Sequence, residues 1–240
     1  MRNRLLVGVS EGVPSPTVDI RLGDVVVSTP NEVDSGVMQC KVPEGKVPVE
    51  IIGWLERPPH ALLGAANKVR EKRGKPRRHM AHIKKAILRY PEVKEHSTFP
   101  GRKQDLLFQS RYNHHEGDRC NNCSPSEIIQ RAPRNSTDPI THYGSIASVD
   151  IVVRNTSLRD RMSQISGVIG IDMEAAGLKQ DFPCMMIRGI ANYSDSHSNT
   201  KFQKYAAMTA AAYAKELLAS LDATSTQNVT IAADEVSVDK

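Results

Sequence analysis

The stretch GVIGIDMEAAGLKQDFPCMMIRGIAN, residues 167–192, carries the pattern that decides the fold. Short apolar runs at 167–171 and 184–190 predict buried strands, and the segment 173–179 between them predicts a helix. Residues 201–220 form a long Ala-rich segment whose large apolar side chains share one helical face. Strands that alternate with helices in this way predict an α/β layered domain with a largely parallel sheet.

The same kinds of pattern extend outward from this stretch. Five apolar or β-branched runs predict further strands: 5–9, 25–28, 33–41, 47–53 and 142–148. Three segments predict helices: Pro58 to a stop at Gly74, 80–89, and a segment opened by the capping-box pattern of Ser124–Glu127. Residues 221–240 are polar and aperiodic, so the domain is expected over 1–220 and the remainder is interpreted as a disordered tail or truncated linker.

Composition excludes several classes of protein. The 240 residues are 39% hydrophobic and 25% charged, which rules out collagen-like, coiled-coil and wholly disordered chains. Four cysteines are too few for a disulfide framework. The apolar run after Arg2 and Arg4 is too short for a signal peptide, and no other run approaches the roughly 18 residues of a membrane span. We therefore expect a cytoplasmic protein with no membrane partner.

The positive charge is concentrated in one segment. The chain carries a formal charge of +5, yet residues 68–89 hold ten lysines and arginines against Glu71 alone, a local charge of +9. Such a patch could follow nucleic-acid phosphates, but its only aromatic neighbour is Tyr90, so it offers no base-stacking platform. A solvated helix pair is the preferred interpretation, and a nucleic-acid partner is not expected.

A Cys-rich loop raises the question of a metal. His114, His115, Cys120 and Cys123 place four zinc-type ligands within ten residues. Adjacent histidines project in different directions, however, and a second CxxC motif is missing. Free thiols in a surface loop are therefore the preferred interpretation, and no metal is expected.

Two polar side chains follow the strands that flank 173–179. Glu174 stands at the start of the predicted helix, where the helix dipole favours a carboxylate that can accept hydrogen bonds from ligand hydroxyls. Asn192 follows the strand at 184–190. Ligands of open α/β sheets bind beyond the carboxyl ends of strands, so both side chains are candidates for a site. Acidic first turns and Asn after a strand are also common without any ligand.

Taken together, these residues carry a family resemblance. Segments 171–177 and 182–197 resemble the C-terminal half of the purine nucleoside and uridine phosphorylase superfamily, which includes methylthioadenosine nucleosidases. They are similar in particular to the nucleoside-phosphorylase-like domains of filamentous fungi. Segments 20–28, 143–148 and 205–218 agree with the same family.

The resemblance implies a fold, a reaction and partners. The implied fold is a three-layer α/β/α sandwich with a mixed, largely parallel sheet, here incomplete at the N-terminus. The implied reaction cleaves the N-glycosidic bond of a purine nucleoside, with phosphate or water as acceptor and no other cofactor. Active members of the superfamily are oligomers, which implies a homo-oligomer. Fungal relatives are often fused to NACHT, ankyrin or tetratricopeptide modules.

The resemblance also assigns substrate-binding positions. Glu174 would bind the ribose hydroxyls and Met173 would pack against the sugar, with Asp172 beside them. Val152 occupies the position at which bacterial nucleosidases place an aromatic ring against the base. Gly12 belongs to a turn that approaches the ligand closely.

The sequence departs from the family pattern at its catalytic position. Asn192 stands where the family has the aspartate that protonates the leaving purine, and an amide can donate a hydrogen bond there but cannot supply a proton. General acid catalysis is typically worth about 10² to 10⁴ in rate. Glu11 puts a charge into the turn near the ligand, and the family's phosphate-binding or water-activating groups precede the point at which this chain starts. Two hypotheses follow: an N-ribosyl-cleaving enzyme with a weakened leaving-group contact, or a catalytically impaired nucleoside-binding or scaffold domain.

Overall fold

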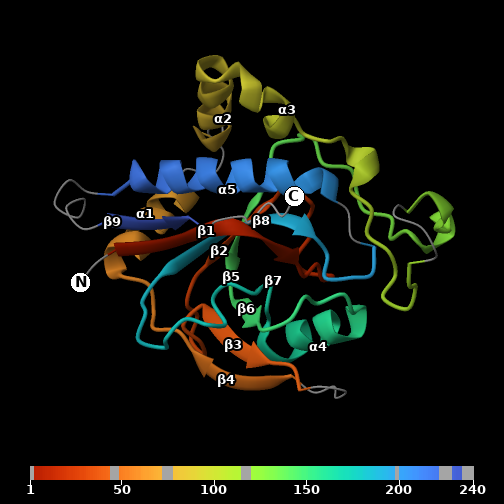
Figure 1. Ribbon diagram of the computed structural model, residues 1–240, viewed down its shortest axis with the longest axis horizontal. Helices are drawn as coiled ribbons and strands as arrows, with labels where there is room; N and C mark the ends of the chain where they lie inside the picture. The colour runs from red at the N-terminus through yellow and green to blue at the C-terminus, as the bar shows by residue number, and fades with distance from the viewer. Residues whose placement is uncertain are drawn as a thin grey trace, which may run out of the picture.

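A computed structural model describes residues 3–43, 49–71, 78–114, 120–197, 200–221 and 229–233. Nine strands in these ranges form a single sheet (Figure 1). They are β1 (Asn3–Gly12), β2 (Val25–Ser28), β3 (Val37–Lys41), β4 (Glu50–Trp54), β5 (Thr141–Gly144), β6 (Ile146–Val149), β7 (Gly170–Asp172), β8 (Met185–Asn192) and β9 (Val229–Ala233). No helix in the described ranges is both long enough and apolar enough to cross a bilayer.

The sheet is mixed, and its parallel pairings outnumber the antiparallel ones. Its strand order is β4-β3-β6-β7-β1-β8-β2-β5, and β9 pairs with β1 outside this path. The antiparallel pairs are β1 with β7, β2 with β8 and β3 with β4, whereas the other five pairings are parallel. The predicted α/β fold with a mixed, largely parallel sheet is confirmed.

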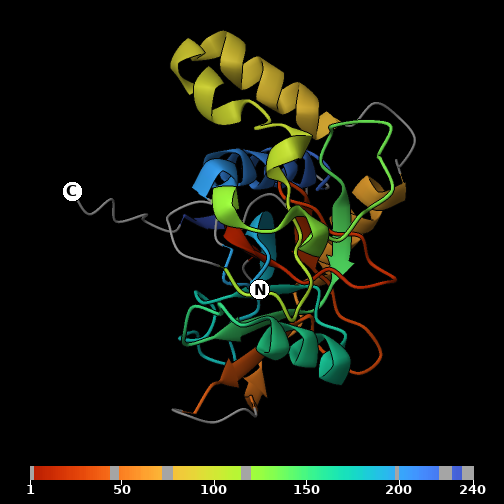
Figure 2. The same ribbon diagram turned by 90° about the vertical axis from the view of Figure 1, so that its right-hand side faces the viewer.

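Helices cover both sides of the sheet (Figures 1 and 2). The five α-helices in the described ranges are α1 (His60–Glu71), α2 (Arg78–Arg89), α3 (Lys94–Ser97), α4 (Thr156–Ser166) and α5 (Gln203–Leu218). Helices α1 and α5 lie on one face, with α2 stacked outside α5, whereas α4 lies on the opposite side. The contact of β8 with α5 is close: a Cβ on Gly189 would come within 1.9 Å of the Ala206 carbonyl oxygen.

The central strands contain continuous apolar runs because both of their faces are buried. In β2, Val25 and Val27 pack in the core under α1 and α5, whereas Val26 joins the core on the other face. Leu5 and Leu6 of β1 divide between the two cores in the same way. This explains why continuous apolar runs, rather than alternating ones, predicted these strands correctly.

Two of the predicted helices are turns. Residues 173–179 form no helix, and the side-chain amide of Gln39 instead donates hydrogen bonds to the carbonyl oxygens of Ala175 (2.9 Å) and Leu178 (2.8 Å). The Ser124–Glu127 pattern produces only a 3-10 turn, Pro125–Glu127, without a capping side-chain bond. Ile128 then pairs with Phe108 in an isolated β-bridge, which ends the turn.

The predicted strand at 142–148 is two strands. It breaks at Ser145, whose hydroxyl donates to the Asp34 carboxylate at 2.7 and 2.8 Å. β5 then pairs with β2, while β6 pairs with β3 and β7. The predicted strand at 33–41 is shorter than expected, since β3 begins at Val37.

Three elements escaped prediction: the four-residue helix α3, helix α4 and strand β9. Helix α4 begins after Asn155, whose side chain accepts from the Leu158 amide at 3.1 Å, and ends at Gly167 with φ of 61°. An N-cap asparagine and a left-handed glycine are recognised helix boundaries, so this signal was present in the sequence. Strand β9 lies beyond the predicted domain end at 220 and pairs in parallel with β1. The other residues of the predicted tail, 222–228 and 234–240, fall outside the described ranges, as does Gly74.

Candidate functional site

A cavity of about 280 Å³ lies beside the carboxyl ends of β1 and β8, where β7 joins β1. Five of the residues predicted from the sequence line it: Val152, Asp172, Met173, Glu174 and Asn192. Gly12 does not. It packs inside the sheet, where an added Cβ would lie 2.8 Å from Ile190 Cγ2.

A β-bulge places Asn192 at this cavity. Along the β1–β8 ladder Ser10 pairs with Ile190, but Glu11 pairs with Asn192, so Ala191 is an extra residue on β8. A bulge bends its strand and redirects the side chains that follow, and bulges are frequent next to active sites. The chain then passes through Ser194, a buried residue with φ of 52°, in the left-handed region that non-glycine residues rarely adopt.

Glu174 and Met173 come from the turn after β7. Met173 is 42% exposed and the Glu174 side chain is 39% exposed, so both can reach a ligand from the solvent side. Because residues 173–179 form a turn, the helix dipole predicted to support Glu174 is absent. Its carboxylate instead lies 3.2 Å from the guanidinium of Arg188.

Arg188 is the buried charge beneath the site. It is fully buried on β8, and its Nη2 lies 2.8 Å from Asp172 Oδ2 and 3.2 Å from Glu174 Oε2. Burial raises the pKa of Asp172, and the Arg188 guanidinium opposes that shift. Asp172 is itself buried at the floor of the cavity, where it holds Arg188 under Glu174. The signal for Arg188 was a charge inside an apolar strand, which sequence reasoning passed over.

Glu11 is the second residue that sequence reasoning undervalued. It lines the cavity and lies opposite Asn192 in the β1–β8 ladder. Burial raises the pKa of Glu11 to about 7, with Ser194 and Arg154 opposing the shift and Asp195 adding to it. A carboxyl with a pKa near neutrality exists in both protonation states at pH 7, as a general acid or base requires.

Replacing Glu11 by glutamine is expected to change how stability depends on pH. The folded-state pKa of Glu11 is raised from 4.5 to about 7, so its stabilising contribution is complete below pH 4.5 and is lost as pH rises through 7. Glutamine stays neutral, so the variant should match the wild type near pH 4.5 and exceed its free energy of unfolding by up to about 3 kcal/mol above pH 8.

Urea unfolding of both proteins at pH 4.5, 6 and 8 measures this difference. Glu50→Gln, at an exposed residue of β4, is the matched control, because it removes a carboxyl group from the surface. A Glu11→Gln difference that stays constant over the three pH values would contradict the assignment.

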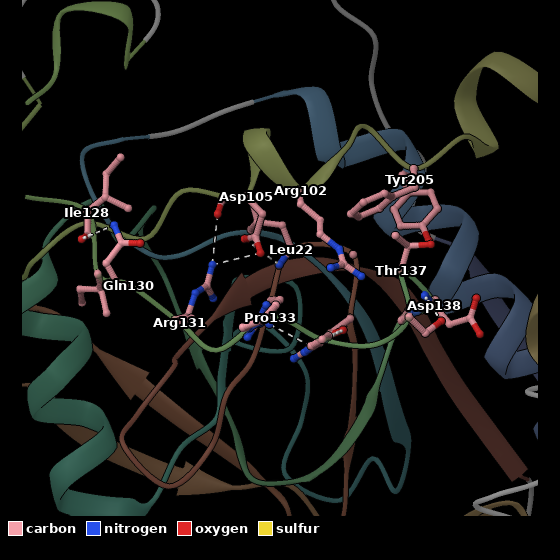
Figure 3. Close-up of a pocket in the computed structure, with 18 residues that line it drawn as sticks. Leu22, Arg102, Asp105, Ile128, Gln130, Arg131, Pro133, Thr137, Asp138 and Tyr205 are labelled. Atoms are coloured by element: carbon pink, nitrogen blue, oxygen red, sulfur yellow. Dashed lines mark hydrogen bonds and ion pairs between the residues drawn. The ribbon is translucent and has the colours of Figure 1, made fainter. Parts of the chain in front are cut away.

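A second cavity, also of about 280 Å³, is lined by several arginines (Figure 3). Two of these arginines are paired with carboxylates: Arg131 Nη2 lies 3.0 Å from Asp105 Oδ2, and both terminal nitrogens of Arg134 lie 2.8 Å from the Asp24 carboxylate. Arg131 also donates to the Tyr193 hydroxyl at 3.0 Å. This network attaches the long segment between α3 and β5 to the turn before β2, and we assign it a structural role.

The burial of the two cysteines in the Cys-rich loop also differs from what the sequence led us to expect. Cys123 is buried and Cys120 is half-buried, so they are not exposed thiols of a surface loop. They lie beside His114, as the motif suggested, and beside His197, which follows β8 and was not predicted. His115 lies outside the described residues.

Comparison with solved structures relates this architecture to known proteins. The chain superimposes on the 5′-methylthioadenosine/S-adenosylhomocysteine nucleosidase of Neisseria meningitidis in complex with methylthio-immucillin-A, with a TM-score of 0.51 and 14% sequence identity. The match covers 92% of this chain and 70% of the nucleosidase. The chain has a nucleosidase-like α/β fold. A futalosine hydrolase mutant of Helicobacter pylori gives a TM-score of 0.48 at 17% identity, with the same 92% and 70% coverage.

Sequence comparison adds one curated relative and no family model. No family model matches the chain. A nucleotide-binding leucine-rich repeat (NLR)-like protein of Hyaloscypha variabilis is 39% identical over 221 residues, which is 91% of this chain and 22% of that protein. The chain therefore spans about a fifth of the length of the relative it matches.

Proposed function

We propose that the chain binds a purine nucleoside in the cavity beside β1, β7 and β8 and cleaves its N-glycosidic bond. The observation that carries the proposal is the convergence of Glu174 and Met173, from the turn after β7, with Asn192, from the bulged end of β8. These are the side chains to which the family resemblance assigns ribose and base contacts. The nucleosidase-like fold is consistent with the proposal.

Each side of the nucleoside has a chemically suitable group in the cavity. The Glu174 carboxylate accepts hydrogen bonds from the ribose hydroxyls, and Arg188 beneath it fixes its position. Met173 packs against the sugar, and Val152, which is 52% exposed, offers an apolar wall to the base. The Asn192 amide donates to a nitrogen of the purine.

Bond cleavage needs a proton for the leaving base and a nucleophile for the sugar. The C1′–N bond breaks with its electron pair moving to the base, which takes up a proton. The oxocarbenium-like sugar is captured by phosphate, or by water with loss of a proton to solvent. Asn192 stabilises the departing base without protonating it. Glu11 is the ionisable group opposite Asn192, and its pKa of about 7 lets it hold a proton at neutral pH.

The test measures binding and turnover on the same protein. Calorimetric titration with adenosine, inosine and methylthioadenosine reports binding, and chromatography of free base with and without phosphate reports cleavage. Glu174→Gln should weaken binding about 10- to 100-fold, because it removes a charged hydrogen-bond acceptor. Glu92→Gln, at an exposed residue away from the cavity, should change nothing. Wild-type protein that neither binds nor cleaves these nucleosides would refute the proposal.

A nucleoside-binding or scaffold domain without turnover is the second candidate. Asn192 favours it, because the amide cannot act as the acid of the family reaction. The similarity to part of an NLR-like protein is compatible with a binding domain inside a larger protein. The same experiment separates the two candidates, since this one gives calorimetric binding with no released base.

A further inference from the structure

Four potential metal ligands converge beyond the end of β8, outside the nucleoside cavity. The ligand atoms of His114, Cys120, Cys123 and His197 all lie within 4.8 Å of one another. Cys120 Sγ lies 3.7 Å from both His114 Nδ1 and His197 Nδ1. Cys123 Sγ lies 3.4 Å from His114 Nδ1 and 3.6 Å from His197 Nδ1. Two sulfurs and two nitrogens therefore face a common centre.

These separations match the edges of a zinc tetrahedron. Zinc binds Cys sulfur at about 2.3 Å and His nitrogen at about 2.0–2.1 Å, so a tetrahedral angle puts sulfur and nitrogen about 3.6 Å apart. The four measured sulfur–nitrogen separations, 3.4 to 3.7 Å, lie around this value. A tetrahedral set of two thiolates and two imidazoles is the donor set of structural zinc sites.

The surroundings orient His197 as a ligand. Its Nε2 lies 3.0 Å from the Tyr112 carbonyl oxygen, a partner that can only accept. The proton is therefore on Nε2, which leaves the Nδ1 lone pair facing the two sulfurs. Metal-bound histidines typically donate a hydrogen bond from the ring nitrogen that does not bind the metal. The ring is also stacked on Phe108, with 4.0 Å between the ring centroids.

Backbone contacts hold the two contributing segments together. The His114 amide donates to Ser196 Oγ at 2.9 Å, and the His197 amide donates to Asp195 Oδ1 at 2.9 Å. Cys120 and Cys123 are adjacent through a 3-10 turn in which the Cys123 amide donates to the Cys120 carbonyl at 3.2 Å. The ligands are thus brought together by local structure on both segments.

We propose that His114, Cys120, Cys123 and His197 bind one zinc ion. All four coordination positions come from protein side chains, so the site is structural rather than catalytic. The ion connects His114, Cys120 and Cys123 to the loop after β8, which follows Asn192 of the nucleoside cavity. A disulfide between the two cysteines would leave both histidines without a role, and the two thiols are free in this structure. The proposal does not depend on the proposed function.

The first measurement is the metal content of the full chain, purified in reducing buffer without chelator. About one zinc per chain is expected for the wild type and less than about 0.1 for Cys120→Ala, Cys123→Ala and His197→Ala. Cys40→Ala, at a buried thiol of β3 away from the cluster, is the matched control and should keep about one zinc.

A cobalt titration covers the case in which a variant fails to fold. Metal is removed from the wild type with a chelator, folding is checked by circular dichroism, and Co²⁺ is added. The intense visible absorption of tetrahedral thiolate-bound cobalt should appear with one equivalent and disappear when zinc is added. Folded, reduced wild type that takes up neither metal would overturn the proposal. So would zinc content unchanged by the cysteine variants, or a Cys120–Cys123 disulfide found by mass spectrometry in metal-free wild type.

Discussion

Asn192→Asp is expected to raise the rate of free-base release from purine nucleosides by about 10²- to 10⁴-fold. This range is the usual worth of a positioned general acid. Asparagine and aspartate have nearly the same shape, and the bulge at Ala191 places this side chain at the cavity lined by Glu174. The change therefore adds a carboxyl group at this position with little change in side-chain shape.

The measurement is steady-state release of adenine or hypoxanthine by wild type and variant, over a range of pH and with and without phosphate. Asn135→Asp, at an exposed position, controls for the added charge and should leave the rate unchanged. Unfolding curves establish that the variant is folded. A folded Asn192→Asp variant that binds nucleoside without faster release would show that the missing acid is not what limits cleavage.

Asp24→Ala is expected to have the largest effect on stability, about 3–5 kcal/mol, because it leaves buried charges without their partner. The Asp24 carboxylate is 1% exposed and accepts hydrogen bonds from Arg134 (2.8 Å twice), His142 (2.9 Å) and the amides of Arg21 (2.9 Å) and Ile140 (2.8 Å). Burial alone would raise the pKa of Asp24, but the hydrogen bonds from His142 and Arg134 outweigh it and lower the pKa.

This lowered pKa sets the pH range in which the contribution is seen. The stabilisation that the Asp24 carboxylate gives the folded protein is present in full above the ordinary pKa of aspartate, 3.8. It is lost as the pH falls through the lower pKa that Asp24 has in the folded state. Urea unfolding at pH 7 measures the cost, and Asp181→Ala, at an exposed residue, should stay within about 0.5 kcal/mol of the wild type. A cost for Asp24→Ala below about 1 kcal/mol at pH 7 would mean that Arg134 and His142 find other partners.

The sequence predicted the elements whose pattern is local and strong. Strands β1, β2 and β8 are continuous apolar runs buried on both faces, and α5 is long and periodic. The predicted helix at 173–179 was wrong because Gln39, more than a hundred residues earlier, takes up the carbonyl groups of this segment. Strand β9, Val229–Ala233, is a short β-branched and apolar run that was passed over because the tail around it is polar, and it pairs with β1.

The same difference between local patterns and long-range contacts decided which residues of the candidate site could be predicted. Glu174 and Asn192 were predicted because each follows a recognisable strand, and the structure brings them to one cavity. The roles of Arg188 and His197 were missed, and Glu11 was noted only as a charge near the ligand, because the role of each depends on partners far away in the sequence. His197, for instance, lies beside the CxxC motif although it is 74 residues away from Cys123 in the sequence.

The central position of β1 has a consequence for synthesis on the ribosome. Its pairing partners in the described residues are β7, β8 and β9, all from the last third of the chain. Strand β1 therefore waits with both edges open until residues 170–192 have been translated. Such long-range pairing slows folding and exposes strand edges to aggregation. Nascent chains should consequently depend on chaperones that shield the unpaired, apolar strand β1.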